Sequence, residues 1–483
     1  MSHKNTSKEK QAVYIHWFRQ DLRLRDNLSL TRAWQCTAKE NSAKLLPVYI
    51  LDEENAGSLK HGGASRWWLS QSLANLDKEL YGLLSIYKGD AHEIICKYLM
   101  QHFLIKGVFW NRCYEPWHLS HDNKIEKTLK SHNIEVKSFN SALLWEPWDA
   151  LKKDGTPYRV FTPFYKNGCL DNEKIPREPL AAPSLEKTKI ICHAAAMGLN
   201  NTNLLPQRKW AKKLEPHWHI GEQGAQECLE KFIQTGLGGY EQGRNYPART
   251  KVSRLSPYLH FGEISPHQIR EKISKFGDET NPDIKTFIKE LIWREFSYNI
   301  LYHEPYLPEQ NLQSKFDNFP WQNNQEHLKA WQKGMTGYPI VDAGMRELWQ
   351  TGYMHNRVRM IVGSFLVKNL MLHWRHGFKW FWDCLVDADL ANNAANWQWV
   401  AGCGADAAPY FRIFNPVTQS KKFDPEGTYI KRYIPELKKL SNKEIHEPWN
   451  VPVSHKKDYP EPIVDLKASR ERALVAFQSL KKP

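Results

Sequence analysis

The chain has 483 residues, 41% of them hydrophobic and 25% charged, which is the balance of a globular protein long enough for two domains. A formal charge of +14 and 20 residues each of Trp, Tyr and Phe favour nucleic acid as a partner, although a basic enzyme with Trp-rich cores has the same composition. No run of 18 apolar residues occurs and the polar opening lacks the apolar centre of a signal peptide, so we expect a cytoplasmic protein without a membrane span.

The first third of the chain alternates strand and helix patterns. Apolar runs typical of strands occur at VYIHWF (13–18), LLPVYIL (45–51), KGVFW (106–110) and IEVKSF (134–139). Helical patterns lie between them at 28–35 and 65–81. Such alternation predicts a parallel α/β sheet, and we place this first domain at residues 12–142.

Residues 143–215 are rich in Pro, Lys and Asn and have little periodicity, so they are interpreted as a long surface connection. Helical periods dominate afterwards, which predicts an all-helical second domain over residues 216–480. The predicted helices are 221–233, 265–275, 284–302, 325–333, 341–350, 356–374, 379–386 and 392–399. The eight cysteines are scattered without a C-x-x-C pair, so we expect reduced, mostly buried thiols and no bound metal.

Two helical segments place polar and aromatic side chains on one stripe. In KELIWREF, Glu290, Trp293 and Arg294 share a face with Phe287, which would line a polar pocket with a stacking wall. A salt-bridged helix face with a core Trp is the simpler interpretation of this segment alone. In the segment 385–416, Asp389, Asn393 and Trp397 are spaced four apart, and Asp387 precedes them where a carboxylate could cap a helix.

Two further segments offer charged or hydroxyl groups. In YMHNRVRMIVGSFLV, Arg359 could neutralise a buried carboxylate and Asn356 could contact a base or a ring cofactor, whereas a basic helix start leading into a buried helix is the simpler account. In SRLSPYLHFGEISP (253–266), hydroxyls and backbone donors at a predicted helix start could bind a diphosphate, but serine at a helix start is common.

Seven ordered motifs make these segments specific when taken together: FRQDLRLRDN, SRLSPYLHFGEISP, ELIWREF, GYPIVDAGMREL, MHNRVRM, DADLANNAANWQW and DAAPYFRIFNP. Together they resemble the DNA photolyase and cryptochrome family, in particular bacterial class I cyclobutane pyrimidine dimer photolyases, from Val13 to about Trp449. The resemblance implies a photolyase fold, in which a Rossmann-like α/β antenna domain precedes an all-α domain that binds FAD. The implied activity is light-dependent repair of cyclobutane pyrimidine dimers in DNA, by electron transfer from photoexcited reduced FAD to a dimer flipped out of the helix.

The same resemblance assigns site residues by position. The cofactor set is Tyr240, Val252, Ser253, Arg254, Leu255, Ser256, Phe287, Arg294, Asn356, Arg359, Asp387, Ala388, Asp389 and Asn393, the last beside the isoalloxazine ring. The DNA set is Arg244, Glu290, Trp293, Asn356, Arg357, Met360 and Trp399. The catalytic set is Glu290, which would hydrogen-bond a base of the dimer, Asn393, and the electron chain Trp397, Trp374 and Trp321. Each of these tryptophans taken singly is better explained as a core residue.

Departures from the family pattern leave some details open. Val252 stands where many relatives have Thr, and Phe287 where some have Trp. NRCYEPWH (111–118) lacks the Asn-Glu pair that holds folate in some relatives, with Trp117 and His118 in its place. Methenyltetrahydrofolate held by Glu115 is the expected antenna pigment, with another pigment or none as alternatives.

Three other functions compete with dimer repair. A photolyase for the (6-4) lesion would carry a pair of histidines where this chain has Asn356 and Met360. A cryptochrome, which signals through a partner, is disfavoured by Asn393, because plant cryptochromes carry Asp and insect ones Cys there. An ordinary nucleotide-binding α/β enzyme would explain the first domain only. We expect a monomer with no obligate protein partner.

Overall fold

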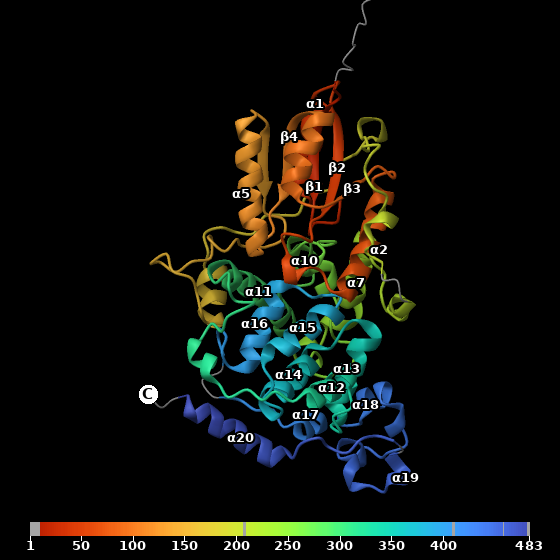
Figure 1. The fold of residues 1–483 in the computed structure, drawn as a ribbon, viewed down its shortest axis with the longest axis vertical. Helices are drawn as coiled ribbons and strands as arrows, with labels where there is room; N and C mark the ends of the chain where they lie inside the picture. Colours follow the sequence, from red (N-terminus) through yellow and green to blue (C-terminus); the bar gives the residue numbers. More distant parts are fainter. Residues whose placement is uncertain (1–9, 206–208, 408–410, 457, 481–483) are drawn as a thin grey trace, which may run out of the picture.

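The computed structural model describes residues 10–205, 209–407, 411–456 and 458–480. Its N-terminal part is a parallel sheet in the order β3-β2-β1-β4-β5 with flanking helices, and its C-terminal part is helical (Figure 1). The strands are β1 (Ala12–Phe18), β2 (Lys44–Leu51), β3 (Ser85–Lys88), β4 (Leu104–Asn111) and β5 (Glu135–Phe139). The predicted fold class is therefore confirmed.

The helices of the N-terminal part are α1 (Leu28–Lys39), α2 (Gly63–Glu79), α3 (Ala91–Glu93), the π-helix η2 (Ile94–Leu99), α4 (Met100–His102) and α5 (Pro116–Ser131). Asn27 begins α1 by accepting a hydrogen bond from the backbone of Leu30. The sequence did not predict β3 or α5. β3 has only four residues, and α5 buries only Asp122, Ile125 and Leu129, so neither has a strong hydrophobic period.

The C-terminal part contains a long series of helices. They are α7 (Glu222–Phe232), α8 (Tyr240–Gly243), α9 (Ser256–His260), α10 (Pro266–Ser274), α11 (Pro282–His303), α12 (Gln325–Lys333), α13 (Pro339–Thr351), α14 (Asn356–Ser364), α15 (Trp374–Cys384), α16 (Leu390–Ala401), α17 (Pro416–Phe423), α18 (Thr428–Tyr433), α19 (Val453–Lys456) and α20 (Leu466–Ser479). Figure 1 places α11, α14, α15 and α16 in the middle of the molecule and α20 along its far edge.

The helix predicted over residues 356–374 is two helices. α14 continues as the π-helix η10 (Phe365–Asn369), and Met371 then adopts a left-handed backbone with φ +52°. His373 caps the next helix, α15, by accepting a hydrogen bond from the backbone of Arg375. The prediction was wrong because the break occurs at Met371, a residue type that rarely adopts this backbone, and not at a glycine or proline.

The connection over residues 143–215 was interpreted as a surface segment, but the helical part binds much of it tightly. Phe161 and Phe164 are buried, and α11 holds the backbone of the segment with polar side chains. Glu295 accepts hydrogen bonds from the backbone N–H groups of Leu144 and Trp145, and Asn299 donates to the carbonyl of Pro147. The connection therefore contributes to the packing around α11.

The motif FRQDLRLRDN (18–27) joins the two parts of the molecule. Arg23 is fully buried and donates to the carbonyls of Gly262, Asp26 and Ser141. Gly262 has φ +67°, and a Cβ there would lie 2.0 Å from the carbonyl oxygen of Gln20. Only glycine permits this approach, so the charged loop of the motif is a structural contact between the sheet and the helices.

Six of the eight cysteines are buried and none forms a disulfide, as expected; Cys192 is exposed and Cys228 is half-buried. Among the described residues, no helix combines the length and the apolar character that crossing a membrane requires.

Candidate active site

Helix α11 holds the first group of predicted site residues. Asn281 begins the helix by accepting hydrogen bonds from the backbone of Asp283 and Ile284, and Pro282 occupies its first turn. Glu290 and Trp293 are half-buried one turn apart, whereas Phe287 and Arg294 are buried. The predicted stripe therefore presents a carboxylate and an indole toward solvent and anchors the other two side chains in the core.

Four of the residues predicted to bind DNA lie together. Nη1 of Arg244 lies 2.5 Å from Oε1 of Glu290. Arg357 donates a hydrogen bond to Asn245 and lies 3.6 Å from the sulfur of Met360. Burial and the charge of Arg244 lower the pKa of Arg357, and Glu290 opposes them. This surface thus holds one carboxylate between two guanidinium groups. Asn356 is exposed at the first turn of α14, directly before Arg357.

Trp293 and Trp399, the tryptophans predicted to flank the substrate, are linked by residues of the connection over 143–215. The rings of Trp293 and Phe161 stack with centroids 3.6 Å apart and planes 6° apart. Trp399 donates to the carbonyl of Asp406, whose backbone N–H donates to the carbonyl of Arg159. The sequence interpretation missed Phe161 because it lies in a segment without helical or strand periodicity.

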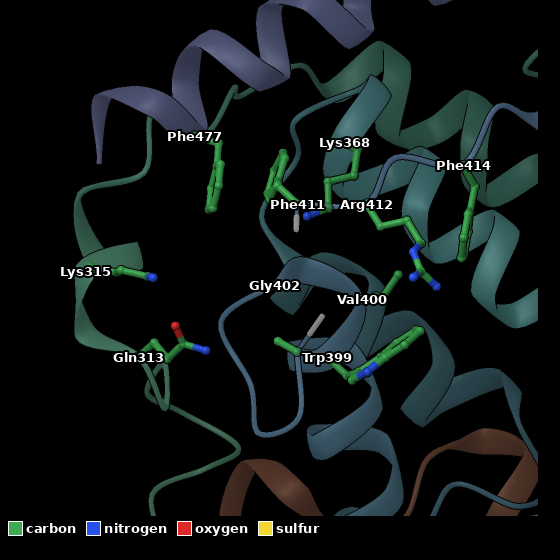
Figure 2. Close-up of a pocket in the computed structure, with 11 residues that line it drawn as sticks. Gln313, Lys315, Lys368, Trp399, Val400, Gly402, Phe411, Arg412, Phe414 and Phe477 are labelled. Atoms are coloured by element: carbon green, nitrogen blue, oxygen red, sulfur yellow. The ribbon is translucent and has the colours of Figure 1, made fainter. Parts of the chain in front are cut away.

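A cavity of about 160 Å³ lies beside Trp399 (Figure 2). Lys315, Lys368 and Arg412 are the basic residues that line it, and the rings that line it are Trp399, Phe411, Phe414 and Phe477. Lys368 is buried and donates to the carbonyl of Ala401, and burial lowers its pKa well below the usual value. These basic residues were not predicted, although Arg412 falls within the motif DAAPYFRIFNP.

The guanidinium of Arg359 has a buried carboxylate partner, as the sequence suggested. Its Nη2 lies 2.8 Å from Oδ2 of Asp387, and its Nε donates to the carbonyl of Met354. Ser256 donates to the same carboxylate at 2.6 Å. Burial lowers the pKa of Arg359, but Asp387 raises it above its ordinary value, so the guanidinium keeps its charge. Ala388 is buried next to this pair.

Asp389 is the N-cap of α16 and accepts a hydrogen bond from the backbone of Asn392 at 2.8 Å. Tyr298 also donates to this carboxylate, and the ring of His260 lies 3.7 Å from it. Burial alone would raise the pKa of Asp389, but His260, Arg294 and Tyr298 outweigh this effect and lower the pKa to about 2. Asn393, one turn along α16, is buried and donates to the carbonyl of Phe378 at 3.1 Å.

Arg294, which was assigned to the flavin wall, donates to the carbonyl of Ala142 at 2.7 Å. Its guanidinium lies 4.7 Å from the ring centre of Tyr298. It therefore connects the Asp389 cluster to the end of the sheet domain.

Residues 253–256 form a strained corner before α9. Arg254 has φ +54°, and its guanidinium lies 4.2 Å from the ring centre of Trp218 and 5.0 Å from that of Tyr353. Leu255 is buried and Val252 and Ser253 are half-buried. α9 has only five residues, so the predicted diphosphate site does not lie at the start of a long helix. Sequence interpretation missed Trp218 and Tyr353 because an isolated aromatic residue normally indicates core.

Tyr240 and Phe287 pack edge to face, with ring centres 5.4 Å apart. Among the described residues, the buried polar atoms without a hydrogen-bond partner include Nε of Arg254, both ring nitrogens of His260 and Nε2 of His355, all in or next to the predicted cofactor set. A buried polar atom without a partner is costly, so such groups fit a site that takes a polar ligand. This arrangement fits FAD, with the cation Arg254 for its diphosphate and the polar side chain Asn393 for its ring.

The three predicted electron-chain tryptophans run from two buried positions to a half-buried one. Trp397 is 3% exposed, Trp374 is fully buried, and Trp321 is half-buried. Trp397 packs against Gly377 of α15, where a Cβ would lie 2.0 Å from its ring. Trp374 donates to Asn311 at 2.8 Å, and Trp321 packs against Phe319 with ring centres 4.4 Å apart.

The segment predicted to hold an antenna pigment also has unsatisfied polar atoms. Glu115 is buried; its Oε1 accepts a hydrogen bond from Gln20, and its Oε2 has no partner among the described residues. Nε1 of Trp117 likewise has none there. Cys113, Glu115 and His118 place one donor atom each within 4.8 Å of one another, a set able to ligate a metal. Burial raises the pKa of Cys113 and of Glu115 and lowers that of His118, so in each case it disfavours the charged form.

Two family models match the chain. The model described as the FAD binding domain of DNA photolyase matches residues 287–479, and the DNA photolyase model matches residues 14–184. A deoxyribodipyrimidine photo-lyase of Agrobacterium fabrum is 47% identical over 98% of this chain and 99% of its own length. Plant cryptochromes also match along most of the chain.

Solved structures agree with these matches. A bacterial class III photolyase from Agrobacterium tumefaciens superposes with a TM-score of 0.90 and 45% identity, covering 99% of this chain and 100% of that one. An archaeal photolyase from Sulfolobus tokodaii with two FAD molecules gives a TM-score of 0.81 and 31% identity, covering 97% of this chain and 100% of that one. The class III structure corrects the expected likeness to class I photolyases. The chain belongs to the DNA photolyase and cryptochrome family and carries that family's FAD-binding domain.

Proposed function

We propose that this protein repairs cyclobutane pyrimidine dimers in DNA with blue light. The observation that carries the proposal is the position of Glu290 on α11, half-buried beside the indole of Trp293 and paired with the cation Arg244. A carboxylate next to a stacking surface can accept hydrogen bonds from a base that has left the helix. The 47% identity to a protein named deoxyribodipyrimidine photo-lyase supports the same reaction.

The proposed substrate pocket combines charge and stacking. Arg244 and Arg357 lie on either side of Glu290, where they would bind phosphates that flank the lesion, and the net charge of +14 attracts DNA from a distance. Trp293 and Trp399 would stack against the two bases of the dimer. Met360 and Asn356 would complete the pocket wall, and neither is the histidine expected for (6-4) repair.

The proposed cofactor site lies deeper in the helical domain. Ser253, Arg254, Leu255, Ser256 and Tyr240 would hold the phosphates and sugar of FAD, with Val252 at the edge of this group. The Arg359–Asp387 pair, Ala388, Asp389, Arg294 and Phe287 would form the wall around the ring, with Asn393 and Asn356 next to it. Bound FAD supplies the photoexcited electron that opens the dimer. The protein residues orient the ring, exclude water and keep Asp389 ionised.

The tryptophans Trp397, Trp374 and Trp321 would carry an electron inward from the surface to reactivate an oxidised cofactor. Trp397 and Trp374 are both buried, whereas Trp321 is half-buried and approaches solvent, which supports this direction. The packing of Trp397 against Gly377 of α15 and of Trp321 against His373 also supports the proposal.

The test is repair of an oligothymidine that contains cyclobutane dimers, with the reduced protein under blue light and recovery of base absorbance as the signal. A dark sample and a (6-4) substrate are the controls. We expect recovery on the dimer alone and only in the light. Bound, reducible flavin with no recovery on either lesion would indicate a cryptochrome, and recovery on the (6-4) substrate would reassign the lesion.

Four further expectations belong to this proposal. The domains are 12–142 and 216–480, joined by 143–215, and the end of β5 at Phe139 and the start of α7 at Glu222 support these limits. The antenna pigment is methenyltetrahydrofolate near Glu115. The protein acts as a monomer without an obligate protein partner, and it acts in the cytoplasm.

A further inference from the structure

His373 lies between two tryptophans of the proposed electron chain. The segments before and after it are held in place by a parallel bridge between Gln322 and Leu372, in which the N–H of Gln322 donates to the carbonyl of Met371 at 2.8 Å. This pairing sets Trp321 against the start of α15. The imidazole centre of His373 lies 5.1 Å from that of the Trp321 ring and 5.6 Å from that of Trp374.

The orientation of the imidazole is fixed by its role as a helix cap. His373 is the N-cap of α15, with φ −59° and ψ 135°, and its Nδ1 accepts a hydrogen bond from the N–H of Arg375 at 3.1 Å. A nitrogen that accepts carries no proton, so the proton of the neutral ring is on Nε2. The ring therefore cannot rotate away from the two indoles without losing the cap.

The charges around His373 keep it neutral. Burial, with smaller contributions from Arg375 and His376 of α15, lowers the pKa of its imidazole to about 4. Asp317, in the 3-10 turn η9 (Ser314–Asn318) that precedes Trp321, opposes them. At neutral pH the group between the indoles carries no charge. A positive charge on either indole is therefore not repelled by an imidazolium.

We propose that His373 is a positioning residue that couples Trp374 to Trp321 in electron transfer. This inference rests on the proposed function. In the step concerned, one electron leaves Trp321 and fills the vacancy on oxidised Trp374, so Trp374 becomes neutral and the positive charge moves to Trp321. His373 neither gains nor loses an electron or a proton. Tunnelling weakens steeply across empty space or water, and the imidazole packs against both indoles, with ring centres 5.1 and 5.6 Å away, so it offers a path through a packed π system.

Two substitutions separate coupling from capping. His373→Asn keeps a side-chain acceptor suited to an N-cap and removes the ring, whereas His373→Phe keeps a ring and removes the acceptor. His376→Asn, three residues along the same helix, is the matched control. Each variant is prepared as the full chain with its flavin bound in the oxidised state. Three quantities are measured: the yield of the long-lived Trp321 radical after a blue flash, the melting temperature, and, in the dark, the titration of the labelled His373 imidazole by NMR.

We expect His373→Asn to lower the radical yield severalfold with an unchanged melting temperature. His373→Phe should keep most of the yield and lower the melting temperature, and His376→Asn should change neither. In the unmodified protein the imidazole should titrate near pH 4. A full radical yield in His373→Asn, or an imidazole that titrates near its ordinary pKa, would overturn the inference. If the unmodified protein forms no Trp321 radical, the electron chain itself fails, and dimer repair by the reduced protein remains a separate measurement.

Discussion

At the scale of single residues, the most informative side chain is Glu290, because its partner in this structure is a cation and not the substrate. Arg244 occupies one carboxylate oxygen at 2.5 Å, so binding of a dimer would have to share or replace this contact. Both side chains are partly exposed, so the ion pair itself stabilises the protein little. The role of the ion pair is to hold the Glu290 carboxylate at the edge of the pocket.

Replacing Glu290 with Gln tests this role while keeping the shape of the side chain. A hydrogen bond to a charged acceptor is worth about 1.5–3 kcal/mol, so we expect repair per absorbed photon, or dimer affinity, to fall roughly tenfold. The melting temperature should stay the same. Glu271→Gln is the control, because Glu271 forms only a surface pair with Lys275. Equal loss in both variants would mean that Glu290 acts through general charge and not as an acceptor for the base.

At the scale of elements, α15 and α16 approach so closely that only glycine fits at position 377. A Cβ on Gly377 would lie 2.0 Å from the Trp397 ring, whereas a Cβ on Gly363 of α14 would lie 3.7 Å from the same ring. Gly377→Ala should gain helix propensity, but it must displace the indole and therefore destabilise the protein by about 1–3 kcal/mol.

Chemical denaturation measures this effect, and flash photolysis should reveal a changed yield of tryptophan radical because Trp397 has moved. In Gly363→Ala the Cβ would lie 3.7 Å from the indole and 3.3 Å from Cγ1 of Val400, a contact that a small shift of one side chain relieves. This control should leave both quantities close to those of the unmodified protein. A stable Gly377→Ala variant with an unchanged radical yield would contradict the packing described here.

The elements also explain which features the sequence could predict. Three of the four predicted strands, β1, β2 and β4, are apolar runs buried along most of their length, as parallel strands are. The fourth, β5, is a partly exposed edge strand with alternating apolar and polar residues. β3 is too short for such a run, and α5 is polar on most of its surface. The break at Met371 has no glycine or proline to mark it.

In the candidate site, too, the sequence predicted some contacts and missed others. Local spacing predicted a carboxylate cap for this helix but placed it at Asp387; the cap of α16 is Asp389, and Asp387 pairs with Arg359 instead. The pairing of Arg359 with a carboxylate was suggested by the resemblance, and the structure identifies Asp387. Phe161, Trp218 and Tyr353 reach the site from segments distant in sequence, and no local pattern distinguishes them from core aromatic residues.

At the scale of the whole molecule, the two parts are joined by buried polar contacts, and one of them should make stability depend on pH. Oε2 of Glu295 accepts hydrogen bonds from the backbone of Leu144 and Trp145 at 2.9 and 3.2 Å. Its Oε1 is buried with no hydrogen-bond partner among the described residues. Burial raises the pKa of this carboxyl to about 8, although Arg294 and the two N–H groups lower it.

A carboxyl whose pKa is higher in the folded state binds a proton more tightly there than in the unfolded chain. Its contribution is complete below the ordinary glutamate pKa and decreases as the pH rises toward 8. We therefore expect the free energy of unfolding in urea to fall between pH 5 and pH 8, by on the order of 3 kcal/mol from this group. Glu295→Gln keeps an oxygen for the two N–H groups and cannot ionise, so it should remove that part of the pH dependence. The exposed Glu309→Gln should leave the dependence unchanged. If the free energy of unfolding of Glu295→Gln fell by as much between pH 5 and pH 8 as that of the unmodified protein, another group would have to release the proton. The junction between α11 and the connection would then not control the dependence of stability on pH.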